Sequence, residues 1–368
     1  LYEMPAVRAA ASMTVATQNQ GGNFVNLRGL GATRTLTLVD GRRFVPTTNT
    51  GIVDINAIPS ALVERIEVVT GGASAAWGSD AVSGVINLVL KKKIEGFQGS
   101  AQFGLSEHGD NRERTTTLAW GSDFADGRGQ FMIAGEFSKL DQVAMQYSRD
   151  WGRHRWGWVP GTIDGQPVAR IPMQGVTASG ITDGGVIVAQ PGSPLRGIQF
   201  GAGGKAIPFH YGTNVGANLM VGGDGGVDGD NYPLATPLER KNVFARTTFD
   251  ITDQVSAFAE LSYAESYSLG RTMPDYTPNG EPIITIQRDN AYLDPAVRAI
   301  MTDNGLQSFN MGRRWREFND PYLRVSGSNK VTRGAIGLEG TLDNGWGWDA
   351  HIASGKTTYA ARSYDHMI

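Results

Sequence analysis

The chain has 368 residues, and its 33 lysines and arginines against 36 acidic residues give a net charge of −3. This balance argues against a nucleic-acid-binding protein, which would carry a basic excess, and the absence of cysteine excludes disulfides, thiolate zinc sites and cysteine nucleophiles. No apolar run of about 18 residues is present, so no transmembrane helix is expected. A membrane β-barrel stays compatible with the mean hydropathy of −0.25, because its lipid-facing residues alternate with polar ones.

Residues 1–96 consist of short β-prone segments separated by turns. Strands are predicted over 25–27, 35–39, 66–69 and 85–90, and a short helix over 59–63, where Pro59 suits a first helical turn. The pair Asp40-Gly41 between two β-prone runs predicts a hairpin. On these residues alone, the segment is a small mixed α/β module without evident chemistry.

Five motifs follow one another in this segment and make a family resemblance specific. They are VNLRGLG at 25–31, TLVDGRR at 37–43, VERIEV at 63–68, GGASA at 71–75 and WGSDA leading into GVINL at 77–88. In this order they resemble the plug domain of TonB-dependent outer-membrane receptors, over about residues 23–92. The resemblance implies that the plug contacts a barrel wall, and we expect this interface at Arg28, Glu64, Arg65 and Glu67. In the family a second plug arginine follows the VERIEV strand, whereas Thr70 stands at that position here. An ionic contact between plug and wall is therefore half missing or differently built.

Longer alternating segments begin at residue 97. Apolar and polar residues alternate with period two, as in Phe97–Leu105 and Val255–Tyr263, which is the pattern of a membrane barrel strand. Seven strands are predicted, over 97–106, 112–122, 130–147, 239–251, 255–268, 321–342 and 346–360. Tight connections alternate with two long ones at 148–238 and 269–320, which are expected to be extracellular loops.

The predicted fold class is thus an incomplete antiparallel membrane β-barrel with an N-terminal mixed α/β plug. The expected domains are the plug at 1–96 and the N-terminal part of the barrel at 97–368. Plugged outer-membrane transporters have ~22 strands, so seven indicate a fragment of a larger protein.

Residues suited to catalysis are scarce. The histidines at 108, 154, 210, 351 and 366 show no helical i, i+4 spacing, and Gly204-Lys205 lacks the glycine and hydroxyl positions of a phosphate loop. No enzyme activity and no cofactor are therefore expected. The acidic, glycine-rich run at 222–230 offers Asp224, Asp228 and Asp230 as oxygen ligands for calcium. A solvated loop tip is the simpler interpretation, and we prefer it.

Ligand contacts are expected at the plug apex and in the first long loop. The resemblance implies apical loops at Gly31, Ala32 and Thr33, and at Pro46, Thr47, Thr48, Asn49 and Thr50. The second run is uncharged and rich in hydroxyl and amide groups, which slightly favours a carbohydrate-like or siderophore-like ligand. In the long loop, Trp151, Trp156 and Trp158 alternate with arginines and can stack on sugar or catecholate rings. The alternative for these aromatics is an interfacial girdle whose arginines contact lipopolysaccharide phosphates.

The resemblance implies an energised importer in the outer membrane of a Gram-negative bacterium. Its expected partners are TonB with the inner-membrane complex that energises it, a scarce nutrient ligand, and outer-membrane lipid and lipopolysaccharide, with no nucleic acid. The ligand could be a ferric siderophore, cobalamin or a carbohydrate. The alternative function is a passive barrel or surface receptor without energy coupling.

Overall fold

The computed structural model describes residues 4, 6–9, 22–48, 50–153, 156–216, 218–226, 233–274, 284–315 and 322–364. The chain divides into two compact units, which we describe separately. The first comprises 1–144, 233–270 and 325–363, and the second comprises 145–232, 271–324 and 364–368. Within the described residues, no helix is both long and apolar enough to cross a membrane.

The plug at the start of the first unit is built on a four-stranded sheet in the order β4-β3-β6-β5. Strands β3 (Thr35–Val39) and β6 (Gly84–Leu90) are parallel, and β4 (Arg42–Arg43) and β5 (Val63–Val69) pair antiparallel to their neighbours. The predicted hairpin is confirmed, because Asp40 and Gly41 both have positive φ, at 49° and 73°, as a type I′ turn requires. A further short pair joins β1 (Val7–Ala9) and β2 (Val25–Leu27).

The helices of the plug are short. The helix predicted over 59–63 is a single 3-10 turn, η3 (Ser60–Leu62), because β-branched Val63 already begins β5 and pairs with β6. The other short elements are η1 (Ala32–Arg34), η2 (Ile55–Ala57), α1 (Ser74–Trp77) and η4 (Ser79–Ala81).

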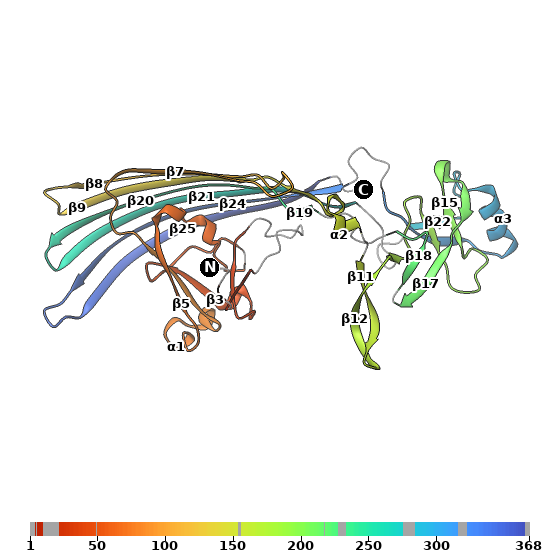
Figure 1. The fold of residues 1–368 in the computed structure, drawn as a ribbon, viewed down its shortest axis with the longest axis horizontal. Helices are drawn as coiled ribbons and strands as arrows, with labels where there is room; N and C mark the ends of the chain where they lie inside the picture. The colour runs from red at the N-terminus through yellow and green to blue at the C-terminus, as the bar shows by residue number, and fades with distance from the viewer. Residues whose placement is uncertain are drawn as a thin grey trace. The chain divides into compact units, whose positions relative to one another are not determined.

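Seven long antiparallel strands form a curved wall beside the plug, and the predicted partial barrel is confirmed (Figure 1). In sheet order they are β25 (Gly347–Tyr364), β24 (Tyr322–Thr341), β21 (Val255–Pro274), β20 (Leu238–Thr252), β9 (Gly129–Leu140), β8 (Glu113–Phe124) and β7 (Gly96–Gly104). The tight connections at 125–128, 253–254 and 342–346 lie at one end of the wall, which we call the turn end. The opposite end, where the two long connections leave, is the loop end.

The two faces of the wall differ as the alternation predicts. The inner face packs on the plug, and its Met132, Ala134 and Phe244 share one hydrophobic core with plug residues Leu27 and Leu62. The outer face exposes large apolar side chains, among them Phe97, Phe103, Leu118, Trp120, Ile133, Phe137, Val243, Leu261, Ile336 and Ile352. An exposed apolar band on one face of a sheet is the feature that a lipid-facing barrel wall requires.

The second unit is a folded body assembled from both long connections. Its five-stranded sheet joins β14 (Val186–Val188), β15 (Ile198–Phe200) and β16 (Ala206–Pro208) of the first connection to β22 (Ile284–Gln287) and β23 (Ser308–Gly312) of the second. Helix α3 (Pro295–Asp303) covers it, with Asp294 as its N-cap, as predicted. The remaining elements of the second unit are η5 (Gln146–Ser148), α2 (Asp150–Arg153), the hairpin β11 (Trp156–Ile163) and β12 (Gln166–Gln174), β13 (Val176–Ala178), η6 (Ala202–Gly204), β17 (Tyr211–Gly216) and β18 (Leu219–Gly223). The two-stranded pair of β10 (Val143–Met145) and β19 (Pro233–Ala235) belongs to the first unit except for Met145.

Candidate functional site: the contact between plug and wall

A buried glutamate on the inner face of the wall binds two wall arginines. Glu260 of β21 lies directly opposite Arg246 of β20. Its Oε1 accepts hydrogen bonds from Arg246 Nε at 3.1 Å and Nη2 at 2.7 Å, and its Oε2 accepts one from Nη1 of Arg333 on β24 at 2.8 Å. Only 2 % of the Glu260 and Arg333 side chains is exposed. At such burial, loss of one charged partner leaves the others uncompensated and destabilises the structure strongly.

The plug adds charges to this group through the β3–β4 hairpin. The Asp40 carboxylate pairs with Arg246, and Arg42 Nη2 pairs with Oε2 of Glu339 on β24 at 3.1 Å. The Arg42 guanidinium carbon also lies 3.9 Å from the centre of the Phe258 ring, a cation–π contact with the wall. We call these six residues, with three charges of each sign, the plug–wall charge cluster: Asp40, Arg42, Arg246, Glu260, Arg333 and Glu339.

Hydrogen bonds to β6 hold the hairpin that carries Asp40 and Arg42. Asp40 Oδ1 accepts from the backbone N–H of Leu90 at 2.8 Å, while the Gly41 N–H donates to Asn87 Oδ1 at 2.8 Å. The tight turn and these two bonds fix the position of the hairpin. The plug therefore presents its two charges to the wall from a rigid support.

A polar cavity of about 550 Å³ adjoins the charge cluster. Plug residues Arg65, Glu67 and Lys92 line it on one side, and wall residues Asp250 and Ser256 line it on the other. Asp250 and Ser256 flank the β20–β21 turn, so the cavity lies toward the turn end of the wall. Of the cluster residues, Asp40, Arg42, Arg246, Glu260 and Glu339 form part of its lining.

Neutral groups of the plug make a second set of contacts with polar and charged wall residues, nearer the loop end of the wall. The Ser60 N–H and hydroxyl both donate to Glu136 Oε2 on β9, the N–H at 3.0 Å. On β20, Arg240 Nη1 donates to Asn56 Oδ1 at 2.5 Å, and Asn242 Nδ2 donates to the Asn56 carbonyl at 3.1 Å. The 3-10 turns η2 and η3 thus dock directly on the wall.

A buried carboxylate organises the loop that precedes these contacts. Asp54 Oδ1 accepts from the backbone N–H groups of Asn23 at 3.0 Å and Asn56 at 2.9 Å. Only 3 % of the residue is exposed, and this burial raises the pKa of Asp54 to about 6, although the two backbone donors oppose the shift. Asp54 consequently changes its charge close to neutral pH.

The N-terminal part of this structure corresponds to a known domain family. Residues 2–85 match the family model of the TonB-dependent Receptor Plug Domain. The chain carries the plug domain of a TonB-dependent receptor. Such receptors lie in the outer membrane of Gram-negative bacteria, and the apolar outer face of the wall suits that location.

Several solved structures have some similarity to the chain, which spans about two fifths of the length of those named here. They include the ferric enterobactin receptor of Pseudomonas aeruginosa with enterobactin, at 14 % identity and a TM-score of 0.44, covering 96 % of this chain and 42 % of that one. The siderophore receptor PirA of Acinetobacter baumannii has 13 % identity and a TM-score of 0.43, covering 98 % and 41 %. The ferripyoverdine receptor of Pseudomonas aeruginosa has 12 % identity and a TM-score of 0.37, covering 98 % and 40 %.

Two of the threonines expected to contact ligand at the plug apex, Thr47 and Thr48, form hydrogen bonds within the plug. Thr47 is fully buried, and its hydroxyl donates to the Ile52 carbonyl at 3.0 Å and accepts from the Asp54 N–H at 2.8 Å. The Thr48 hydroxyl accepts from the Ile52 N–H at 3.1 Å and contacts the Thr50 hydroxyl at 2.9 Å. The hydroxyls of Thr47 and Thr48 are thus held inside the plug, and a contact of these residues with ligand stays a prediction. Asn49 lies outside the described residues.

Four of the predicted ligand residues, Ala32 among them, line one cavity. Thr33, Pro46 and Thr50 are exposed and line a space of about 590 Å³ between the plug and the wall, together with wall residues Arg333 and His351. Of the other predicted residues in that part of the plug, Gly31 has φ 105° in the turn before η1, and Ala32, which also lines this space, is 9 % exposed.

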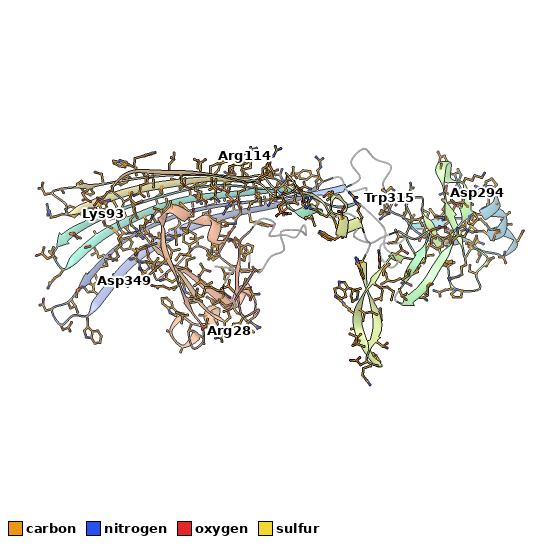
Figure 2. The ribbon with its side chains drawn as sticks, viewed as in Figure 1. Arg28, Lys93, Arg114, Asp294, Trp315 and Asp349 are labelled. Carbon is orange, nitrogen blue, oxygen red and sulfur yellow. The ribbon has the colours of Figure 1, made fainter. Side chains whose placement is uncertain are left out.

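The four predicted interface residues of the plug differ in where they lie relative to the wall. Arg28 is exposed at a left-handed turn position, φ 56°, on the side of the plug away from the described wall (Figure 2). Arg65 pairs with its neighbours Glu64 at 3.4 Å and Glu67 at 2.9 Å rather than with the wall. Arg65 and Glu67 nevertheless line the polar cavity between plug and wall, and the interface role of Glu64, Arg65 and Glu67 stays a prediction. For Arg28 it stays a prediction about wall strands outside the described residues.

The loop candidates lie in the second unit. Trp151 in α2 and Trp156 and Trp158 in β11 are each about 60 % exposed, so their rings are accessible for stacking. The calcium candidate Asp224 is used otherwise, because its Oδ2 accepts from the backbone N–H of His210 at 2.8 Å and from Gln199 Nε2 at 3.0 Å. Asp228 and Asp230 lie outside the described residues, and the described part of the chain shows no cluster of three metal-ligating side chains.

Sequence reasoning missed the charge cluster itself. A usable signal existed, since Arg246, Glu260, Arg333 and Glu339 are charges at mid-strand positions that alternate with the apolar outer-face residues. A charge in that position must face either the lumen or the plug. Its partners could not be identified without the register of β20 and β21, which decides that Arg246 lies opposite Glu260.

Proposed function

We propose that this chain is part of an importer that captures a scarce nutrient outside the cell and carries it across the outer membrane with energy from TonB. The observation that carries the proposal is the plug–wall charge cluster. A plug held by buried ion pairs closes the lumen at rest, because breaking the pairs is costly. Opening a path then requires work on the plug, which is what an energised partner supplies.

The proposed ligand is a scarce nutrient such as a ferric siderophore, cobalamin or a carbohydrate. Two places in the structure suit contacts with it. The cavity lined by Thr33, Pro46 and Thr50 offers hydroxyl and carbonyl groups, and the exposed rings of Trp151, Trp156 and Trp158 offer stacking surfaces. The buried hydroxyls of Thr47 and Thr48 no longer support a preference between ligand classes.

A reversible tether between plug and wall tests the proposal in the full-length receptor. A Cβ atom placed on Gly355 of β25 would lie 3.3 Å from the Cβ of Val45 in the plug, close to the ~3.5–4.5 Å that a disulfide requires. The chain has no cysteine of its own. We expect Val45→Cys/Gly355→Cys to form a disulfide when oxidised and to hold the plug in place.

Uptake of radiolabelled ferric siderophores and cobalamin, and growth on oligosaccharides, identify a transported ligand first. Cells that carry the oxidised double variant should then take up this ligand no faster than cells without TonB. Reduction of the disulfide should restore uptake. The single variants Val45→Cys and Gly355→Cys are the matched controls and should transport under both conditions. Full uptake with the disulfide formed, or in cells without TonB, would instead support the passive barrel.

A further inference from the structure

The outer face of the wall carries a pair of like charges near its loop end. Arg114 of β8 and Lys139 of β9 are cross-strand partners in the sheet register, and both side chains are exposed. Ser138, the neighbour of Lys139, faces inward and accepts from Arg240 Nη2 at 3.2 Å. Because side chains alternate along a strand, Lys139 and its partner point outward. Figure 2 shows Arg114 on the face of the wall opposite the plug.

Neither cation of this pair has an anionic partner among the residues that the structure describes. The nearest acidic position in the register is Glu239, which lies opposite Lys139, but its carboxylate pairs with Lys241 at 2.8 Å. On the other side, the register places Phe103 opposite Arg114. Like charges directly opposite each other destabilise a sheet. An external anion bound between the two cations would offset this repulsion.

Arg114 and Lys139 lie at the edge of the apolar outer surface that is nearer the loop end. On the same face of β9, Phe137 lies two residues from Lys139 toward the turn end. On β8, Leu118 lies four residues from Arg114 in the same direction, with Thr116 between them. At about 3.3 Å per residue, apolar surface begins within ~7–13 Å of the two charges. Phe103, Leu118 and Phe137 are 64 %, 50 % and 39 % exposed. This arrangement fits a molecule with an anionic head and acyl chains.

We propose that Arg114 and Lys139 bind a phosphate group of a phosphorylated glycolipid in the outer leaflet, with its acyl chains on the apolar surface formed by Phe103, Leu118 and Phe137. The arginine guanidinium offers paired N–H donors that match phosphate oxygens, and the lysine adds a second positive charge. Basic residues at the membrane interface recognise lipid headgroups in this way. The proposal rests on the proposed outer-membrane function, which sets the loop end outside the cell.

The test uses the full-length receptor purified in mild detergent and exchanged into nanodiscs. Native mass spectrometry measures the retained diphosphoryl lipid A, and a nanodisc series titrates diphosphoryl against dephosphorylated lipid A. We expect Arg114→Gln/Lys139→Gln to retain at least tenfold less diphosphoryl lipid A, with binding of the dephosphorylated lipid unchanged. The matched control is Lys93→Gln/Arg128→Gln, which removes the same charge near the turn end and should leave retention as in the wild type.

Two results would overturn the proposal. One is equal retention of diphosphoryl lipid A by the wild type and the Arg114/Lys139 double variant. The other is displacement of the lipid by millimolar inorganic phosphate alone, which would show a site for free phosphate rather than for a lipid. Outer-membrane insertion and nutrient uptake are measured on the same variants, so that failure of the importer proposal is seen separately from failure of the lipid site.

Discussion

Arg246 and Glu260 face each other across two neighbouring wall strands and both are buried beneath the plug hairpin that carries Asp40. The plug therefore contacts this ion pair of the wall directly, because Asp40 also pairs with Arg246. Withdrawal of the hairpin would expose the pair to water and leave Arg246 with one carboxylate partner fewer.

Glu260→Gln should loosen the plug. The substitution leaves Arg246 and Arg333 buried without their shared carboxylate, and we expect a loss of about 3 kcal/mol in the stability of plug docking. Hydrogen exchange of β3 and β6 measures it. Glu339→Gln is the matched control, because the Glu339 side chain is 45 % exposed and an exposed pair contributes ~0–1 kcal/mol. Equal effects of the two variants would contradict a special role for the buried position.

Asp54→Asn should stabilise the plug at neutral pH. The pKa of Asp54 is about 6 in the folded receptor and 3.8 in its unperturbed state, so the folded state holds the proton longer than the unfolded chain. Wild-type stability therefore falls as pH rises from about 4 to about 6 and stays lower above it. The asparagine keeps an acceptor oxygen and removes the charge. We expect a gain of about 2–3 kcal/mol at pH 7.5 that disappears below about pH 4, measured by urea unfolding across pH.

The control for this pH series replaces an exposed carboxylate in place of the buried one. Asp126→Asn, in the β8–β9 turn of the wall, is the matched control for the pH series. A flat difference between wild type and Asp54→Asn from pH 4 to pH 8 would show that Asp54 is not the group responsible.

Thr47→Val should destabilise the plug without touching a ligand surface. Its hydroxyl joins the Ile52 carbonyl to the Asp54 N–H inside the plug. The valine leaves the buried Asp54 N–H unpaired, which costs about 1–3 kcal/mol, while the Ile52 carbonyl keeps its bond from the Thr47 N–H. Thermal unfolding of the receptor measures the effect. Thr50→Val, at an exposed position lining the cavity, should leave the melting temperature unchanged, and any loss of ligand affinity should occur in this variant. A stable Thr47→Val receptor with weakened ligand binding would return Thr47 to the ligand site.

Asp294→Ala should loosen the contact between α3 and β16 in the second unit. Asp294 Oδ1 caps α3 by accepting from the Ala296 N–H at 2.8 Å, and its Oδ2 accepts from the Ala206 N–H of β16 at 2.8 Å. We expect roughly fivefold faster hydrogen exchange in both α3 and β16, since loss of an N-cap has effects of that order. Asp294→Asn, which retains acceptor capacity at the cap, should show a smaller change. Faster exchange confined to α3 would argue against the link to β16.

The sequence was most informative where local rules decide the structure. Alternation along each wall strand, the Asp40-Gly41 turn and the Asp294-Pro295 helix start all depend on neighbouring residues, and all were predicted correctly. The charge cluster depends on contacts 206 residues apart, such as that of Asp40 with Arg246, and no local pattern encodes them. Thr47 shows the same limit, because the hydroxyl and amide groups of its segment suggested ligand contacts, whereas the folded plug buries Thr47 and gives its hydroxyl internal partners.

The shared sheet of the second unit also constrains how this part of the receptor can be exchanged. Val186–Val188 of the first connection is hydrogen-bonded to β23 of the second, with Ile187 opposite Met311. A graft of either connection alone into another receptor would leave an open strand edge and an uncovered face of α3. Any recombination that exchanges these loops between receptors must therefore transfer both segments together, although the wall strands β20 and β21 separate them along the chain.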